Sequence, residues 1–484
     1  MSIKRNSIYN LAGALTPLAV TLLTVPHYLA AIGTARYGLL ALVWLILGYF
    51  SFFDLGLSTA TTNALAQGKR NDASDRASIL FTSLVVQTAL GVTIATCLFL
   101  VAPYLLGFLT RFDPALKAEL IYAMPWLAAA IPLVMVGGVF TGVLSSGEEF
   151  GKINLVSVFG TVLFQTAPLA AAYALTPRLQ VVIPAAVIAR AVPVILTGIL
   201  ALRRIDLRLA RFDTQRLRRL LSYGGWIMVT NFVGPILTSA DQFVVGAHLG
   251  ATAIAAYNVA YSLAVRLAMV PAALGQTLFP RLSRVGRDEA NALTLHAFRS
   301  TILLMTLVCL PAILLVRPFI ASWITPGFAA IAAPVAELLL IGMWINGLAM
   351  LPFVLLRSHG QPDLPAKFHI LEVLPYLALL FAAVHWFGLI GAALAWGVRV
   401  TIDLALLYRV ARLQIVRFPY VWIASAALLA ALLVARSQWF DWIGLCLLAT
   451  ASGSLFLWYV LRVDLTLRTW AQSAIQIVRQ RLIS

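Results

Sequence analysis

The chain has 484 residues, of which 61% are hydrophobic and only 11% are charged. A soluble domain carries roughly 25% charged residues, so this composition leaves too little polar surface to cover a globule in water. It excludes a soluble protein and predicts an all-α polytopic membrane protein, in agreement with a mean hydropathy of +0.93. The net charge of +17 does not indicate nucleic-acid binding, because the basic residues lie in short loops between apolar runs.

Fourteen apolar runs are long enough for transmembrane helices, each of which needs about 20 mostly apolar residues. Lys4 and Arg5 precede the first run, which is too long for the apolar part of a signal peptide and is therefore expected to stay as a helix. In chain order the expected spans are 8–32, 37–66, 77–106, 119–145, 153–175, 181–202, 222–248, 251–279, 299–324, 329–356, 367–387, 389–409, 419–436 and 442–461.

The loops alternate strongly in basic content. Of the 35 Lys and Arg residues, 26 fall in loops on one side and 6 on the other. Cytoplasmic loops of membrane proteins are enriched in Lys and Arg, so this bias predicts a multi-pass protein of the bacterial inner membrane with both termini in the cytoplasm. The even number of spans agrees with this orientation.

A weak internal repeat relates the two halves of the chain. Gly33 follows the first span and Gly250 follows the seventh, and Arg190 and Arg399 both lie in a sixth span of their half. Six spans per half give both halves the same orientation, as in transporters built from parallel repeats. The expected parts are a lobe at 1–202, a basic linker at 203–221, a second lobe at 222–409, two further helices in 410–461 and an amphipathic tail at 462–484.

Several segments resemble the polysaccharide-transport flippases, the O-antigen and exopolysaccharide family of the multidrug/oligosaccharidyl-lipid/polysaccharide exporter superfamily. They are Phe53–Ala60, Ser239–Gly246, Leu249–Gly250, Tyr257, Leu278–Ser283 and Phe387–Ala395. The resemblance implies a two-lobed fold with alternating access and a function as a flippase of undecaprenyl-diphosphate-linked oligosaccharide. It also implies membrane lipids as partners and allows a polysaccharide polymerase or assembly complex as another.

Three arginines fall near the middle of spans, where a charge is costly and indicates function. Arg266 and Arg190 have no acid on their own helix within one turn, whereas Arg399 has Asp403 four residues on. All three are expected to bind the diphosphate, since the planar guanidinium binds phosphate bidentately. A structural ion pair is the alternative for each arginine. Asp54, Asp241, Asp403 and His27 are candidates for gating or coupling, with interhelical hydrogen bonds as the alternative.

Two other function classes compete with a flippase. A cation-coupled drug or metabolite exporter of the same fold would favour an acidic cavity, whereas this chain places three arginines at midspan. A membrane enzyme would need clustered acids, bases or metal ligands, and no Asp-x-Asp motif or Gly-rich phosphate loop occurs. The three cysteines lie apart in apolar runs, so neither a metal site nor a cofactor is expected.

Overall fold

The computed structural model describes residues 3–49, 57–67, 73–108, 113–147, 149–215, 217, 237–282, 284–359, 361, 363–413, 419–437, 439–463 and 468–469. This part of the chain is helical, with eleven helices long and apolar enough to cross a membrane. The prediction of an all-α polytopic membrane protein is confirmed. The count of fourteen spans stays a prediction, because parts of several expected spans lie outside the described residues.

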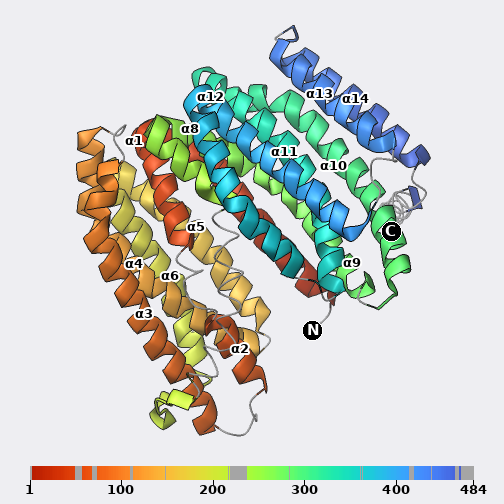
Figure 1. The fold of residues 1–484 in the computed structure, drawn as a ribbon. Helices are drawn as coiled ribbons and strands as arrows, with labels where there is room; N and C mark the ends of the chain where they lie inside the picture. Colours follow the sequence, from red (N-terminus) through yellow and green to blue (C-terminus); the bar gives the residue numbers. More distant parts are fainter. Residues whose placement is uncertain are drawn as a thin grey trace, which may run out of the picture. The chain divides into compact units, whose positions relative to one another are not determined.

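The chain divides into two compact units, residues 1–255 and 256–484, which we describe separately. The predicted boundaries of the lobes stay a prediction. The first unit contains α1 (Ile3–Tyr49), α2 (Leu57–Gln67), α3 (Ala73–Phe108), α4 (Pro114–Ser146), α5 (Phe150–Ala174), α6 (Leu179–Leu202), the 3-10 turn η2 (Leu207–Leu209) and a helical segment over 237–249 (Figure 1).

The second unit begins inside α8 (Ala251–Val265). It continues through the 3-10 turn η3 (Arg266–Ala268), α9 (Met269–Leu282), α10 (Arg287–Trp323), α11 (Pro326–Ser358), α12 (Asp363–Ala411), α13 (Pro419–Ser437) and α14 (Trp442–Val463). The two additional helices α13 and α14 pack on α10, beside the rest of this unit (Figure 1).

Glycines in the left-handed region mark the corners between successive spans. Gly33 (φ 78°) bends α1 between the first two expected spans, and Gly250 (φ 87°) precedes α8 between the seventh and eighth. Gly388 (φ 59°) bends α12 between the eleventh and twelfth. Residues with a Cβ rarely adopt these angles, so glycine fits each corner. The matching corners at Gly33 and Gly250 support the predicted repeat.

Helix packing follows the same order in both units. In the first unit α4 packs against α2, α3 and α6, and in the second α11 packs against α9, α10 and α12. Each central helix begins in the same way, with a capping side chain followed by proline. Asp113 accepts a hydrogen bond from the Ala115 N–H before α4, and Thr325 accepts one from the Phe328 N–H before α11. Proline suits the first turn, because its missing N–H has no intrahelical partner there.

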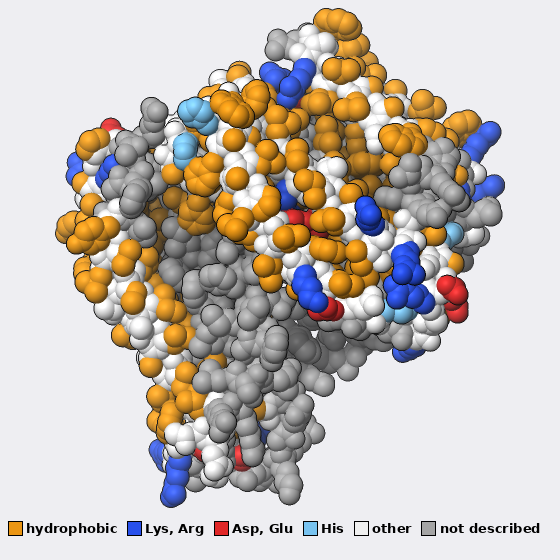
Figure 2. All heavy atoms as spheres, viewed as in Figure 1, with side chains coloured by type: hydrophobic (Ala, Val, Ile, Leu, Met, Phe, Trp, Pro, Cys, Tyr) orange, Lys and Arg blue, Asp and Glu red, His pale blue; other side chains and the backbone are white. Residues whose placement is uncertain are grey.

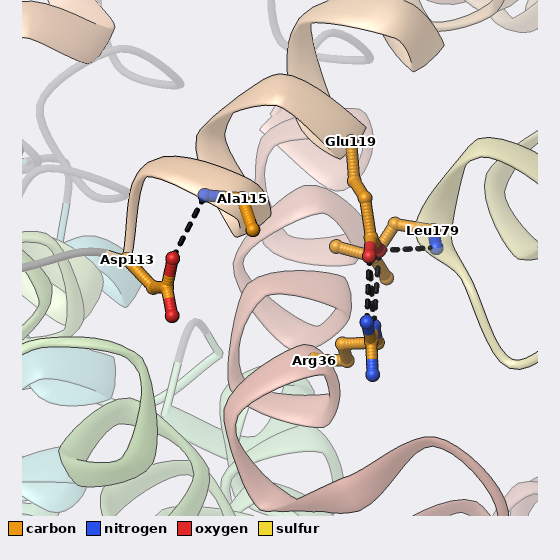
Figure 3. A network of polar contacts seen from close by, with 5 residues as sticks. All are labelled: Arg36, Asp113, Ala115, Glu119 and Leu179. Atoms are coloured by element: carbon orange, nitrogen blue, oxygen red, sulfur yellow. Dashed lines mark hydrogen bonds and ion pairs between the residues drawn. The ribbon is translucent and has the colours of Figure 1, made fainter.

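Two buried glutamates bind three of the six cations expected on the side with few basic residues. Glu119 on α4 pairs with Arg36 on α1 at 2.6 Å and accepts a hydrogen bond from the Leu179 N–H at the start of α6 (Figure 3). Glu337 on α11 pairs with Arg436 on α13 at 3.2 Å and lies 3.8 Å from Arg317 on α10. Each carboxylate therefore joins three helices of its unit.

The surface of the helices suits a hydrocarbon environment. Figure 2 shows hydrophobic side chains over most of the described helical surface that faces the viewer. Large apolar side chains are among the most exposed, including Leu374, Trp386 and Leu433, each at least 70% exposed. A soluble protein rarely exposes contiguous apolar area of this kind, so the surface agrees with a membrane-spanning chain.

The first part of the predicted basic linker lies against α3. The Arg211 N–H donates to the Ser78 hydroxyl at 3.1 Å, and the Asp213 N–H donates to the Thr82 hydroxyl at 3.3 Å. Residues 207–209 form the turn η2, which also packs on α3. The end of the linker lies outside the described residues, as does nearly all of the predicted amphipathic tail.

Candidate functional site

Arg190 lines a pocket inside the first unit. It lies halfway along α6, and the pocket has a volume of about 430 Å³. One face of each of three helices lines it: Val134, Gly137, Gly138 and Thr141 on α4; Ile153, Val156, Ser157, Gly160 and Thr161 on α5; and Arg190, Pro193, Val194 and Thr197 on α6. Ser58 on α2 completes the lining. These residues recur at helical spacing, so each set shares one helix face.

The Arg190 guanidinium has no acidic partner among the described residues. Its one described interaction is with the ring of Phe164, whose centroid lies 5.6 Å from Cζ. Arg190 is exposed to the pocket. A guanidinium has five N–H donors and no acceptor, so the pocket presents a positive charge with free donors. This arrangement suits an anion.

The threonines of the pocket present acceptors. Each hydroxyl donates its hydrogen to a carbonyl one turn back on its own helix: Thr141 to Gly137 O, Thr161 to Ser157 O and Thr197 to Pro193 O, at 2.8–2.9 Å. A hydroxyl has one hydrogen and two lone pairs, so what remains is acceptor capacity. The hydroxyl of Ser58 is buried without a hydrogen-bond partner in the part of the chain that the structure describes. The pocket therefore combines a cationic donor with acceptors suited to hydroxyl groups.

Glycines determine how closely the pocket helices approach. A Cβ on Gly160 would lie 2.9 Å from Cβ and Cγ of Pro193 on α6. A Cβ on Gly137 would lie 2.9 Å from a methyl group of Val194. The pocket thus depends on small residues where α4 and α5 meet α6.

Arg266, predicted as a substrate cation, lies in the second unit where the eighth expected span is broken. The turn η3 separates α8 from α9, and Pro271 explains the break, since its ring cannot donate a hydrogen bond and clashes with the carbonyl of Leu267. Arg266 is half-buried, and its Nε has no hydrogen-bond partner among the described residues. Arg266 thus lies at a local interruption of helical geometry and has no acidic partner in the part of the chain that the structure describes.

Arg399 has a different neighbour from the one expected. Its Nη1 lies 3.9 Å from Oε2 of Glu372 across the bend of α12, and its Cζ lies 5.6 Å from the centroid of the Tyr376 ring. Asp403, expected to pair with Arg399, has His369 at 3.8 Å. Glu372 itself is 7% exposed.

Two other gate and coupling candidates, Asp241 and His27, are not among the residues that line the Arg190 pocket. Asp241 is fully buried, and its Oδ1 accepts a hydrogen bond from the Gln242 N–H at 2.8 Å. The side chain of His27 is exposed, and its backbone carbonyl accepts from the Tyr173 hydroxyl at 3.3 Å. Asp54 lies outside the described residues.

Comparison with known proteins assigns the chain to a family. Residues 3–285 match the family described as polysaccharide biosynthesis protein. The chain belongs to this family. The resemblance found in segments such as Phe53–Ala60 is thereby confirmed, and with it the membership of a group of membrane proteins of polysaccharide biosynthesis.

One relative of this chain is a putative O-antigen transporter of Shigella flexneri. It is 27% identical over 414 residues, which cover 84% of this chain and 97% of the relative. Two solved structures share the fold. A lipid II flippase, MurJ, in an inward closed conformation has a TM-score of 0.72 at 14% identity, with 94% of this chain and 97% of that chain covered. An inward-facing multidrug resistance transporter of the MATE family has a TM-score of 0.65 at 16% identity, with 88% and 96% covered.

The sequence missed the hydroxyl residues of the pocket and the partners of Arg399. Thr141, Thr161 and Thr197 each follow a pocket-lining glycine, serine or proline by four residues, a spacing that could have marked polar faces on three apolar helices. Glu372 and His369 were visible as charges inside an expected span. The sequence did not predict which residues of α12 beyond the bend at Gly388 lie opposite them.

Proposed function

We propose that this chain is a flippase that carries undecaprenyl-diphosphate-linked oligosaccharide across the bacterial inner membrane for polysaccharide biosynthesis. Transport would proceed by alternating access of two lobes at about 8–202 and 222–409. The observation that carries the proposal is the Arg190 pocket, which holds a cation without an acidic partner among the described residues. The family and the Shigella flexneri relative support the same class of substrate.

The pocket chemistry fits the head of such a substrate. An uncompensated charge costs several kcal/mol or more in hydrocarbon, so a diphosphate needs a cation along its path. Arg190 can donate two parallel hydrogen bonds to phosphate oxygens. The threonine lone pairs can accept hydrogen bonds from sugar hydroxyls. A volume of about 430 Å³ is that of a small-molecule site, so the pocket takes the diphosphate and adjoining sugar and leaves the lipid tail in the bilayer.

Arg266 and Arg399 extend the proposal to the second unit. Both would attract the diphosphate at other stages of transport, with Arg399 exchanging its contact with Glu372 for the substrate. Arg266 has the more accessible guanidinium, since Arg399 is only 8% exposed. We therefore expect Arg266→Ala to lose export and Arg266→Lys to restore only part of it, because lysine lacks the planar fork.

The decisive experiment measures transport of a lipid-linked oligosaccharide in proteoliposomes per folded molecule. Arg190→Ala should lower the initial rate at least tenfold, and Arg190→Lys should recover only part of that loss. Arg208→Ala is the control, since this exposed arginine lies on η2 outside the pocket. A native rate for Arg190→Ala would remove the pocket from the substrate path. Transport of cationic drugs instead of the glycan lipid would favour an exporter of the same fold.

A further inference from the structure

The bend of α12 brings two arms of one helix against each other. Gly388 forms the corner, and a Cβ on Gly391 would lie 1.9 Å from the Ala383 carbonyl oxygen, so the returning arm approaches the first arm closely. His369 and Glu372 lie on the first arm, and Arg399 and Asp403 lie on the second. At 1.5 Å rise per residue, Glu372 lies about 14 Å from the start of α12 and Asp403 lies about 12 Å from its end. The four side chains therefore meet at a matching depth.

These side chains form a buried cluster of ionisable groups. Glu372, Arg399 and Asp403 are between 5% and 8% exposed. Arg399 Nη1 lies 3.9 Å from Glu372 Oε2, and His369 Nε2 lies 3.8 Å from Asp403 Oδ1. Both separations exceed hydrogen-bond distance, so the pairs attract each other without being locked together.

Several polar atoms of the cluster are buried without hydrogen bonds. In the part of the chain that the structure describes, both carboxylate oxygens of Glu372, Oδ1 of Asp403 and Nε of Arg399 have no hydrogen-bond partner. A cavity of about 200 Å³ adjoins Glu372 and Arg399; Tyr376 and five apolar residues, Leu371, Pro375, Leu379, Ile402 and Leu406, complete its lining. Unpartnered buried oxygens are costly unless something binds them, and the polar side of this cavity gives access to the carboxylate of Glu372.

The charges of the cluster do not balance. With Arg399 positive, Glu372 and Asp403 negative and His369 neutral, the cluster carries one uncompensated negative charge among apolar helices. One added proton, on His369 or shared with a carboxylate, makes the cluster neutral. We propose that His369, Glu372, Arg399 and Asp403 bind one exchangeable proton and that this proton is the coupling ion of transport.

A proton fits this cluster better than a metal cation. A guanidinium 3.9 Å from Glu372 repels a second cation at that carboxylate. Among the described residues no group of three or more His, Cys, Asp or Glu side chains could hold a metal ion. A proton needs no coordination shell, and its uptake changes only one N–H or O–H bond.

The charged and titratable groups around the cluster contact other residues. From α11, the helix packed against α12, Arg357 lies over the Phe353 ring, which in turn stacks on His369. Glu337 on α11 is held by Arg436 and Arg317. His359 Nδ1 lies 3.2 Å from the Leu355 carbonyl, and on α12 itself Lys367 pairs with Asp363 at 2.7 Å.

Proton binding can change what Arg399 contacts. Without the proton, Arg399 is the one fixed positive charge for two carboxylates. A proton on His369 gives Asp403 a counter-ion of its own, and a proton on a carboxylate removes that negative charge; in either case the attraction on Arg399 weakens. Because Gly388 joins the arms, a change in the attraction between them acts directly on the angle of α12. Protonation thereby links ion binding to the shape of a helix in the second unit.

The transport test rests on the proposed function and uses proteoliposomes with an imposed pH gradient. If one proton accompanies each glycan lipid, the substrate should accumulate about tenfold per pH unit, since one pH unit on one proton corresponds to a factor of ten. Glu372→Gln and Asp403→Asn should keep exchange without a gradient and lose this accumulation. Asp363→Asn, an exposed acid on the same helix, is the matched control.

The outcomes separate the two proposals. Absence of glycan-lipid exchange in the native protein would contradict the proposed function. Accumulation driven by a sodium gradient instead, or gradient-driven accumulation that survives both substitutions, would overturn the proton site.

A second measurement needs no transport. In ¹³C-histidine NMR of the detergent-purified protein, the resonance lost in His369→Gln assigns that side chain. Its titration curve should move in Asp403→Asn and in Glu372→Gln, and should stay unchanged in Asp363→Asn. His385→Gln, an exposed histidine on the same helix, controls the assignment. If the titration curve of His369 is the same in Asp403→Asn, in Glu372→Gln and in the native protein, the proposal is overturned whatever the transport result.

Discussion

Glu119 holds the guanidinium of Arg36 with both of its carboxylate oxygens, as Nε lies 3.0 Å from Oε2 and Nη2 lies 2.6 Å from Oε1. The same carboxylate accepts a hydrogen bond from the Leu179 N–H at 2.9 Å, so three helices of the first unit meet at one acid (Figure 3). Such bidentate, charge-assisted contacts are stronger than neutral hydrogen bonds.

Glu119→Gln should therefore destabilise the protein. Loss of the charge removes the bidentate pair and leaves Arg36, 31% exposed in its side chain, to find water instead. We expect a loss of about 1–3 kcal/mol in the free energy of unfolding, measured as a lower thermal midpoint in detergent. Asp113→Asn is the control, because asparagine can still accept the capping hydrogen bond from Ala115. Equal midpoints for both variants would contradict the role of Glu119.

Thr161→Val should lower transport of the glycan lipid without unfolding α5. The substitution removes an acceptor from the Arg190 pocket and keeps the shape of the side chain. Thr166→Val is a matched control on the same helix, since its hydroxyl makes the same bond one turn back and lies outside the pocket lining. Initial rates in proteoliposomes should fall several-fold for Thr161→Val alone. A similar fall in both variants would point to a general effect on α5.

Gly160→Ala should force α5 away from α6 and disturb the pocket. The added methyl group would meet Pro193 at 2.9 Å, and overpacking of this kind costs about 1–3 kcal/mol. Gly151→Ala, on the same helix with nothing within 4 Å, should be neutral or slightly stabilising. Thermal midpoints and transport rates of the two variants provide the comparison. Unchanged transport in Gly160→Ala would show that the pocket tolerates a wider helix separation.

Reporter fusions test the orientation predicted from the loop charges. Fusions at Ser2, Arg211 and Ser484 should report cytoplasm, and a fusion at Arg178 should report periplasm. The physical reason is the retention of basic loops in the cytoplasm. A periplasmic signal from the C-terminal fusion would require an odd number of spans and would contradict the proposed topology.

The sequence predicted where corners and charges lie along each helix. It did not predict which residues of neighbouring helices contact one another. Apolar runs bounded by glycine predicted the corners at Gly33 and Gly250, because few other residues adopt those backbone angles. Arg190 stood out as a charge in an apolar run. Its threonine neighbours did not, because single hydroxyls are common in such helices and converge only when α4, α5 and α6 pack together.

The same limit explains the neighbours of Arg399. Spacing along one arm of α12 suggested Asp403, four residues away, as its partner. The contact with Glu372 depends on the sharp return at Gly388 and on the register between the two arms, which linear spacing does not contain. The count of fourteen spans remains a prediction, because parts of several expected spans lie outside the described residues.

The position of Glu337 has a consequence for the order of biosynthesis. Arg436, the residue that donates to it at 3.2 Å, follows 99 residues later in the chain. At roughly 5–20 residues per second, that arginine is made about 5–20 s after the glutamate. During this interval Arg317, which is already synthesised, is the one arginine of this trio available to Glu337. A nascent chain interrupted before α13 would therefore carry a carboxylate with a single, looser counter-ion, so α13 completes the charge balance of the second unit.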